Sequence, residues 1–364
     1  MTGQLGRKIR VLVVDDSALI RQILLHVLSD DLAMEVIGVA QDPVGAWRKI
    51  RTLQPDVLTL DVEMPSMDGL TFLEELMATA PLPVVMVSAL TEQGCATALR
   101  ALELGAVDVV NKPKVDIRLG MQELAQELVQ KVKAAARARV RRRPLIRPCT
   151  PAARPVSHRV RAESAMIKTS DTIVAIGSST GGTEAVREVL EVLPPNSPPI
   201  LIAQHMSEHF TKSWADRMNQ LCRISVKEAE DGDSVLPGHA LIAPGDRHMT
   251  LVRSGARYLV RLNQDPPVNR HRPSVDVLFH SVAKYAGRNS IGIILTGMGR
   301  DGAEGLLRMR QSGGFTIAQN EDTCVVFGMP KEAIELGAVD AVLPINDIAK
   351  SLLRRLREED LKVG

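Results

Sequence analysis

The sequence predicts an α/β protein with two doubly wound parallel-sheet domains: a five-stranded one at the N-terminus and a C-terminal one with an antiparallel hairpin insertion. Two observations predict this fold. Short apolar runs, typical of strands buried on both faces, alternate with segments whose apolar residues recur at helical spacing. The alternation is interrupted once, by a basic stretch in which four prolines break any helix. The 364 residues suffice for two or three domains.

The first domain is expected to hold five strands joined by helices. The helix after the first strand is predicted over residues 18–28, where Leu19, Ile20, Ile23 and Leu24 recur at helical spacing. Strands are predicted at 11–14, 36–40, 57–60, 84–87 and 107–110. Because these strand runs are mostly apolar and do not alternate with polar residues, we expect helices to cover both faces of the sheet.

The second domain repeats the alternation. A helix is predicted over residues 184–193. Strands are predicted at 172–176, 199–203, 224–229, 291–295, 315–318 and 338–343. Residues 240–262 are expected to form short antiparallel strands around the turn dipeptides Pro244-Gly245 and Ser254-Gly255. This segment is the predicted hairpin insertion.

The stretch between the two domains carries the positive charge of the chain. Residues 131–161 hold 11 Lys and Arg and no Asp or Glu, so the rest of the chain carries 34 basic and 43 acidic residues. We place the first domain at 8–130, a basic proline-rich linker at 131–169 and the second domain at 170–358. The linker arginines fit a solvated hinge, a phosphate-binding segment or a docking segment for an acidic partner.

Composition excludes several functional classes. No apolar run approaches ~18 residues, so no membrane-spanning helix is expected, and the N-terminus lacks the pattern of a secretory signal. The four cysteines are far apart and lack CxxC spacing, which fits free thiols in a reducing cytoplasm. Aromatic residues make up only 2% of the chain, which argues against a surface that stacks single-stranded bases. We therefore expect a cytoplasmic protein.

Charged side chains follow the strands of the first domain at the edge of the sheet where sites form. Asp15 and Asp16 follow the first strand, Asp61 the third, Ser88 the fourth and Lys112 the fifth. Converging carboxylates repel one another unless a hard cation such as Mg²⁺ joins them. Asp61 is then a candidate nucleophile for an aspartyl-phosphate, with the lysine and serine contacting phosphoryl oxygens. Each aspartate alone also fits a helix cap or a turn.

This constellation resembles the response-regulator receiver domain. The matching stretches are Val11-Leu-Val-Val-Asp-Asp-Ser17, Leu60-Asp-Val-Glu-Met-Pro-Ser-Met-Asp-Gly69, Val84-Val-Met-Val-Ser88 and Asn111-Lys-Pro113. The resemblance implies that a histidine kinase phosphorylates Asp61. It also implies that Mg²⁺ is held by Asp16, Asp61 and the backbone carbonyl of Glu63, with Asp15 in the same acidic set. Val109 stands where many receivers carry an aromatic residue, so the signal must pass through other groups.

A glycine-rich turn, Gly177-Ser-Ser-Thr-Gly181, joins the first strand and helix of the second domain. It matches G-x-S-x-G, in which the central serine, here Ser179, lies on a tight turn and the helix N-terminus favours a developing oxyanion. Such turns also cradle phosphates or simply reverse the chain, although this one lacks a P-loop lysine and the dinucleotide spacing.

A serine nucleophile needs a base and an orienting acid. His205 and Asp301 each follow a strand of the second sheet, so the three side chains are expected at one edge. The remaining histidines of this domain are expected to be structural, namely His209, His239, His248, His271 and His280.

The second domain resembles the catalytic domain of the chemotaxis protein-glutamate methylesterase family. The matching stretches are Ala175-Ile-Gly-Ser-Ser-Thr-Gly-Gly-Thr-Glu-Ala185, Gln204-His-Met206, Ala243-Pro-Gly-Asp246, Asn269-Arg-His-Arg-Pro-Ser-Val-Asp276, Leu295-Thr-Gly-Met-Gly-Arg-Asp-Gly302 and Cys324-Val-Val-Phe-Gly-Met-Pro330. The resemblance assigns the nucleophile to Ser179, the base to His205 and the acid to Asp301. It places Thr180 and Met298 in the loops that help to bind the oxyanion.

Together the two resemblances imply a phosphorylation-activated serine hydrolase that serves adaptation in chemotaxis. The family hydrolyses glutamate γ-methyl esters on methyl-accepting chemoreceptors, releasing methanol, and deamidates receptor glutamines. The implied partners are the chemoreceptors, as substrate and docking site, and a chemotaxis histidine kinase, with only peripheral association with membrane receptor arrays. Mg²⁺ is implied for phosphorylation and no cofactor for ester hydrolysis. The unphosphorylated receiver is expected to cover the catalytic cleft.

One departure from the family pattern and two rival functions remain. Ser178 stands where alanine is usual and adds a second hydroxyl beside the nucleophile. The arginine-rich linker would also suit a receiver-containing DNA-binding regulator, but no helix-turn-helix is recognisable, and arginines alone bind nucleic acid without sequence specificity. A non-catalytic receptor-docking adaptor is the other rival. We expect no specific nucleic-acid partner.

Overall fold

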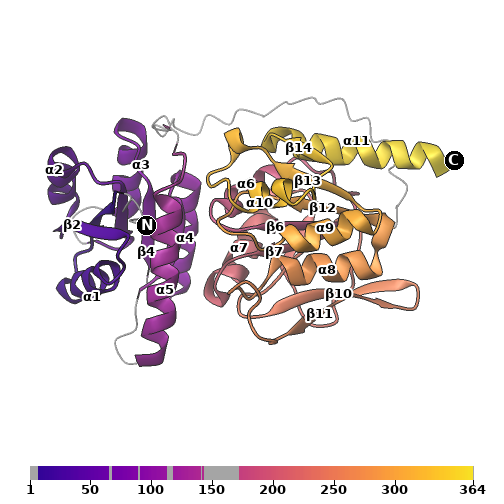
Figure 1. Cartoon of the computed structure of the whole chain (residues 1–364), viewed down its shortest axis with the longest axis horizontal. Coiled ribbons are helices and arrows are strands. Elements are labelled where there is room, and N and C mark those ends of the chain that lie inside the picture. The colour runs from indigo at the N-terminus through magenta and orange to yellow at the C-terminus, as the bar shows by residue number, and fades with distance from the viewer. Residues whose placement is uncertain are drawn as a thin grey trace, which may run out of the picture.

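The computed structural model describes residues 7–64, 68–88, 91–112, 118–140, 142 and 172–363. The protein consists of two α/β domains that lie side by side (Figure 1). The main sheet of each domain is parallel, and the second domain also carries an antiparallel hairpin, which confirms the predicted fold class. Most of the predicted linker, residues 143–169, lies outside the described residues, so its bounds remain a prediction.

The first domain is a five-stranded parallel sheet in the order β2-β1-β3-β4-β5. Its strands are β1 (Ile9–Val14), β2 (Met34–Ala40), β3 (Val57–Asp61), β4 (Val84–Ser88) and β5 (Asp108–Asn111). Its helices are α1 (Ala18–Ser29), α2 (Pro43–Leu53), α3 (Gly69–Thr79), α4 (Glu92–Leu104) and α5 (Arg118–Ala135). Ser17, Asp42 and Thr91 cap α1, α2 and α4 by accepting a backbone N–H from three residues ahead. The caps start these helices directly after the strand-end loops.

The second domain is a seven-stranded parallel sheet in the order β14-β13-β12-β6-β7-β9-β8. Its strands are β6 (Ile173–Ser178), β7 (Ile200–Gln204), β8 (Ser225–Glu228), β9 (His239–Ile242), β12 (Ser290–Ile294), β13 (Phe315–Gln319) and β14 (Ala341–Leu343). Its helices are α6 (Gly182–Leu190), α7 (Glu208–Leu221), α8 (Val275–Tyr285), α9 (Ala303–Gln311), α10 (Met329–Glu335) and α11 (Ile345–Val363), with short 3₁₀ turns η1 (Gly287–Asn289) and η2 (Glu321–Thr323). The neighbouring strands β12, β6 and β7 bring three loops to one edge.

The antiparallel insertion is smaller than the sequence predicted. The hairpin consists of β10 (His248–Ser254) and β11 (Arg257–Asn263), joined at the predicted Ser254-Gly255 turn. Strand β9 instead pairs in parallel with β7 and β8 in the main sheet. The three residues Ala240, Leu241 and Ile242 are all buried, as in any strand covered on both faces.

The two domains meet through helices α4 and α5 of the first domain, which face the second domain (Figure 1). Helix α4 packs on α7 and α6, and a Glu103–Arg217 ion pair of 2.9 Å joins α4 to α7. After α5 ends, Arg139 forms an ion pair of 2.6 Å with Glu321. Since α5 continues to Ala135, the first residues of the predicted linker are helical.

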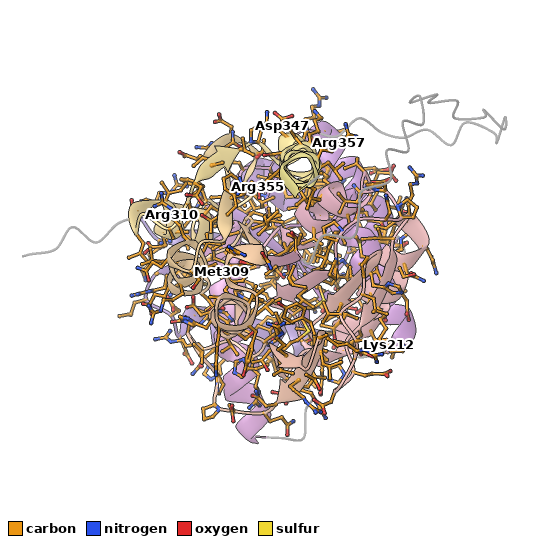
Figure 2. The ribbon with its side chains drawn as sticks, turned by 90° about the vertical axis from the view of Figure 1, so that its right-hand side faces the viewer. Lys212, Met309, Arg310, Asp347, Arg355 and Arg357 are labelled. Carbon is orange, nitrogen blue, oxygen red and sulfur yellow. The ribbon has the colours of Figure 1, made fainter. Side chains whose placement is uncertain are left out.

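Helix α11 lies along the second domain and packs on α6 (Figure 1). Figure 2 views the domain along this helix, with Asp347, Arg355 and Arg357 labelled beside it. The Arg355 guanidinium lies 4.1 Å above the centre of the Phe315 ring, a cation–π contact that ties α11 to β13. Among the helices of the described residues, none has the length and apolar character needed to cross a membrane.

Candidate active site

An acidic cluster lies at the carboxyl end of the first sheet. Carboxylate oxygens of Asp15, Asp16 and Asp61 lie within 4.8 Å of one another. The Lys112 ammonium lies 2.6 Å from Asp61 Oδ2 and 3.3 Å from Asp15 Oδ2. The backbone N–H of Glu63 donates to Asp61 Oδ1 at 3.1 Å. All these residues therefore converge where the sequence placed them.

The electrostatics of this cluster suit a hard cation. Burial raises the pKa of Asp61 to about 6, although the hydrogen bond from the lysine opposes this shift. Burial likewise raises the pKa of Asp15, whose Oδ2 is buried and accepts no well-aligned hydrogen bond. An under-coordinated carboxylate oxygen beside two others is the oxygen donor set that Mg²⁺ takes, so the residues fit the ion. Ser88, at the end of β4, is buried and donates to the carbonyl of Gly94 at 3.0 Å.

The three catalytic candidates of the second domain come from adjacent strands. Ser179 follows β6, His205 follows β7 and Asp301 lies in the loop between β12 and α9. His205 Nε2 lies 2.8 Å from Asp301 Oδ2, and both side chains are almost fully buried. The sheet order therefore places the serine strand between the strands of the base and the acid.

Hydrogen bonds hold the Asp301 carboxylate at the N-terminus of α8. Its Oδ2 accepts the backbone N–H of Val275 at 2.7 Å, and its Oδ1 accepts the Ser274 hydroxyl at 2.8 Å and the Asn269 amide at 2.9 Å. Burial alone would raise the pKa of Asp301, but the hydrogen bonds from His205, Asn269 and Ser274 outweigh it and hold this pKa well below its usual range. The carboxylate is therefore ionised and fixed in orientation.

The His205 ring has one engaged and one free nitrogen. Nε2 donates to the ionised carboxylate, so in the neutral ring Nδ1 carries the lone pair, and Nδ1 is buried without a hydrogen-bond partner among the described residues. The ring of His271 stacks on it, with centroids 3.6 Å apart and planes 10° apart. Burial and the neighbouring His205 lower the pKa of His271 to about 3, so the stacked ring is neutral.

The two expected oxyanion residues flank the serine in different ways. The Thr180 hydroxyl donates to Asp108 Oδ2 of the first domain at 2.8 Å. Met298 is half-buried in the loop after β12, next to Gly297. A Cβ on Gly297 would lie 2.7 Å from Ser179 Cβ, so only glycine lets this loop approach the nucleophile so closely.

The first domain closes the space in front of Ser179. The gap beside the serine is lined by Ser179 and His205 on one side and by Asp108, Val109 and Lys131 on the other. It offers only about 10 Å³, room for roughly one water molecule. The first-domain residues therefore leave little room in front of the half-buried serine in this arrangement.

Sequence reasoning did not find several residues that shape this site. His271 was expected to be structural, yet its ring stacks on the candidate base. Asn269 and Ser274 lie in a stretch that the resemblance singled out without assigning them roles. Asp108 had no signal in the sequence at all, because a contact between domains leaves no local periodicity or spacing.

Comparisons with known proteins agree on both halves of the chain. Residues 174–352 match the family model for CheB methylesterase, and residues 11–124 match that for the response regulator receiver domain. A protein-glutamate methylesterase/protein-glutamine glutaminase of Escherichia coli O157:H7 is 56% identical over 349 residues, covering 96% of this chain and 97% of the relative. One from Chromohalobacter salexigens is 57% identical over 350 residues, with the same coverage. The crystal structure of the Thermotoga maritima CheB methylesterase catalytic domain aligns with a TM-score of 0.50 at 44% identity, covering 51% of this chain and 98% of that domain.

Proposed function

This chain belongs to the protein-glutamate methylesterase/protein-glutamine glutaminase family, and from that membership we propose how its own residues carry out and control the reaction. The chain is a receiver-regulated hydrolase of this family. Its proposed substrates are glutamate γ-methyl esters and glutamine side chains of methyl-accepting chemoreceptors. The observation that carries the proposal is the 2.8 Å pairing of His205 with Asp301 beside Ser179 at one cavity.

Ester hydrolysis proceeds in two steps through an acyl-enzyme. Ser179 Oγ attacks the ester carbonyl carbon while His205 Nδ1 takes the hydroxyl proton. The carbon–oxygen bond to the methoxy group then breaks, and the imidazolium returns the proton so that methanol leaves. Water attacks the acyl-enzyme with His205 again as base, and the serine oxygen leaves with that proton. A glutamine side chain follows the same path and releases ammonia.

The remaining residues stabilise charge during these steps. Asp301 stabilises the imidazolium that forms on His205 and does not itself take the proton. The N-terminus of α6, which has no side-chain cap, favours the negative charge on the carbonyl oxygen. Thr180 and Met298 contribute from the two loops beside the serine. Ester hydrolysis requires no cofactor in this scheme.

The first domain receives a phosphoryl group on Asp61 from a chemotaxis histidine kinase. Asp15, Asp16 and Asp61, with the backbone carbonyl of Glu63, would hold Mg²⁺, which neutralises charge on the transferring phosphoryl group. Lys112 and Ser88 contact the phosphoryl oxygens. The support for this proposal is the convergence of three carboxylates, the lysine and the serine at one sheet edge.

The first domain inhibits hydrolysis by covering the catalytic site, and phosphorylation of Asp61 moves this domain away from the site. Asp108, Val109 and Lys131 line the narrow gap in front of the serine. The Asp108–Thr180 hydrogen bond joins the domains beside the nucleophile. The protein works in the cytoplasm at membrane receptor arrays and needs no nucleic acid. A DNA-binding regulator or a docking adaptor has no use for a buried histidine–carboxylate pair beside a serine.

The deciding experiment measures methanol release from methylated receptor membranes by the full-length protein, treated with a small phosphodonor and Mg²⁺. We expect release by the wild type and none above background by Ser179→Ala. The matched control is Ser312→Ala, which removes an exposed serine hydroxyl at the end of α9. Equal release by wild type and Ser179→Ala would refute the proposed function.

A further inference from the structure

A buried glutamine lies between the nucleophile and the base. Gln204 is the last residue of β7 and is 3% exposed. Its amide nitrogen donates to the backbone carbonyl of Ser179 at 2.9 Å and to that of His205 at 3.2 Å. One carboxamide therefore bridges the backbones of the two residues whose side chains must exchange a proton.

The adjacent strand supplies a partner for the other end of this amide. Ser178 is fully buried and pairs with Gln204 in the β6–β7 register. Its hydroxyl donates to Gln204 Oε1 at 2.6 Å. The second hydroxyl expected beside the nucleophile is thus engaged by Gln204, next to the first turn of α6. It leaves the amide with both ends paired, and the nitrogen faces the two carbonyls, which only accept.

The surrounding backbone leaves little freedom for this arrangement. Ser179 donates its N–H to the carbonyl of Thr296, on the acid side, and its carbonyl also accepts the N–H of Gly182 at 2.7 Å. A Cβ on Gly182 would lie 2.6 Å from Ser178 Cβ, so glycine is what lets α6 start directly against the pair. The serine backbone is therefore tied on one side to the strand of the acid and on the other to the strand of the base.

We propose that Gln204, oriented by Ser178, is a positioning residue that sets the distance between the Ser179 hydroxyl and His205 Nδ1. Their side chains come from different strands, and His205 Nδ1 has no hydrogen-bond partner among the described residues that could hold the distance. Misplacing a reacting group by about 1 Å can cost on the order of 100-fold in rate. The inference rests on the proposed function, since it assigns these two residues to one proton transfer.

The test uses the full-length protein, activated by phosphodonor and Mg²⁺, with initial rates of methanol release measured against receptor concentration. Gln204→Met keeps the length of the side chain and removes both polar ends. We expect kcat to fall by about 10- to 100-fold and KM to stay within about twofold, because the receptor-contacting surface is unchanged. A melting temperature well above the assay temperature shows that the variant is folded.

Two further variants separate positioning from a general structural role. Ser178→Ala leaves Oε1 unpaired, so kcat should fall by a few-fold in the wild-type background and not at all in Gln204→Met. Gln204→Glu turns a carboxylate toward two carbonyl oxygens, and only its protonated form can donate. Its activity relative to wild type should therefore rise as the pH is lowered, and this profile decides the matter if the methionine variant does not fold.

The inference is overturned if folded Gln204→Met keeps more than half of the wild-type kcat, or if its loss appears in KM. It is also overturned if Ser178→Ala lowers kcat equally in both backgrounds, or if the relative activity of Gln204→Glu is independent of pH. A failure of the proposed function itself looks different, because wild type and Ser179→Ala would then release equal amounts of methanol.

Discussion

Removing the Asp108 carboxylate is expected to release the inhibition of the unphosphorylated enzyme. This residue begins β5 at the domain interface, and its Oδ2 accepts the Thr180 hydroxyl at 2.8 Å. In Asp108→Ala the hydroxyl loses its partner across the interface and becomes free to turn toward the catalytic site. Lys131 loses its ion pair of 3.1 Å with Asp108 but keeps its ion pair of 2.8 Å with Glu127 and its bond to the Val109 carbonyl, so the receiver itself should remain folded.

The size of the effect follows from this one hydrogen bond. A hydrogen bond to a charged group contributes about 1.5–3 kcal/mol net, and the lower end applies because the interface is only partly buried. Since ~1.4 kcal/mol is tenfold in an equilibrium, the open fraction should rise about tenfold. The Glu103–Arg217 and Arg139–Glu321 ion pairs remain, so the domains should not separate fully.

The assay compares methanol release from methylated receptor membranes before and after treatment with phosphodonor and Mg²⁺. We expect basal activity to rise about tenfold, phosphorylated activity to stay near wild type and the activation ratio to fall accordingly. Asp31→Ala is the matched control. It removes a first-domain carboxylate that pairs with Lys133, a residue of helix α5 like Lys131, and it should leave the basal and the phosphorylated activity unchanged. A basal rate within twofold of wild type in Asp108→Ala would refute the role of this contact.

Four further predictions concern the same two domains. Ser179→Ala should fold normally and lose on the order of 10³-fold or more in methanol release; a tenth of wild-type activity would exclude it as the nucleophile. Asp61→Asn should keep the basal rate and lose stimulation by phosphodonor with Mg²⁺, and several-fold stimulation of the variant would exclude Asp61 as the only acceptor. A catalytic fragment starting near residue 170 should be more active than the unphosphorylated whole chain; an equal or slower rate would exclude inhibition by coverage. In the folded state the pKa of His271 is lowered to about 3, so as the pH falls from 7 to 5 this side chain gains a proton only in the unfolded state. Protonation of the unfolded state lowers the free energy of unfolding. His271→Phe should remove up to about 2 kcal/mol of the resulting stability loss in urea titrations at the two pH values, and an equal loss in both proteins would contradict this.

The sequence predicted most strands of both sheets because these segments are largely apolar runs. Strand β9 is the exception. Residues 240–242 are an apolar run like the others, but the Pro244-Gly245 turn led to an antiparallel assignment. In the structure this run is buried on both faces of the main sheet, where it pairs in parallel with β7 and β8. Local turn chemistry located the end of the strand and carried no information on its partners.

The residues of the candidate sites fall into two groups: those at strand ends, which the sequence could place, and those in contacts between distant segments, which it could not. Residues at strand ends, such as Asp61, Ser179 and His205, were placeable from sequence, because parallel strands end at one edge of a sheet. Their catalytic roles remain predictions. The stacking of His271 and the contact of Asp108 join segments 66 or more positions apart, and nothing local in the chain specifies either pairing. Docking of one domain on another depends on whole surfaces, which a single sequence does not display.

The hydrogen bonds of β5 offer a route from Asp61, the proposed phosphorylation site, to His205, the proposed base, and this route needs no aromatic switch. Lys112 binds Asp61, and its neighbour Asn111 ends β5 and donates to the Ser207 hydroxyl at 3.3 Å. Ser207 lies two residues after His205 and precedes α7 without capping it. A phosphoryl group on Asp61 would place more negative charge beside the Lys112 ammonium and attract it more strongly. Any resulting shift of the Lys112 backbone would move the adjacent Asn111 as well. Among the described residues, the Asn111–Ser207 bond of 3.3 Å is longer than the Asp108–Thr180 bond of 2.8 Å, so it should break first. The Asp108–Thr180 hydrogen bond, at the other end of the same four-residue strand, would then still join β5 to the second domain, and this route needs no aromatic side chain at position 109.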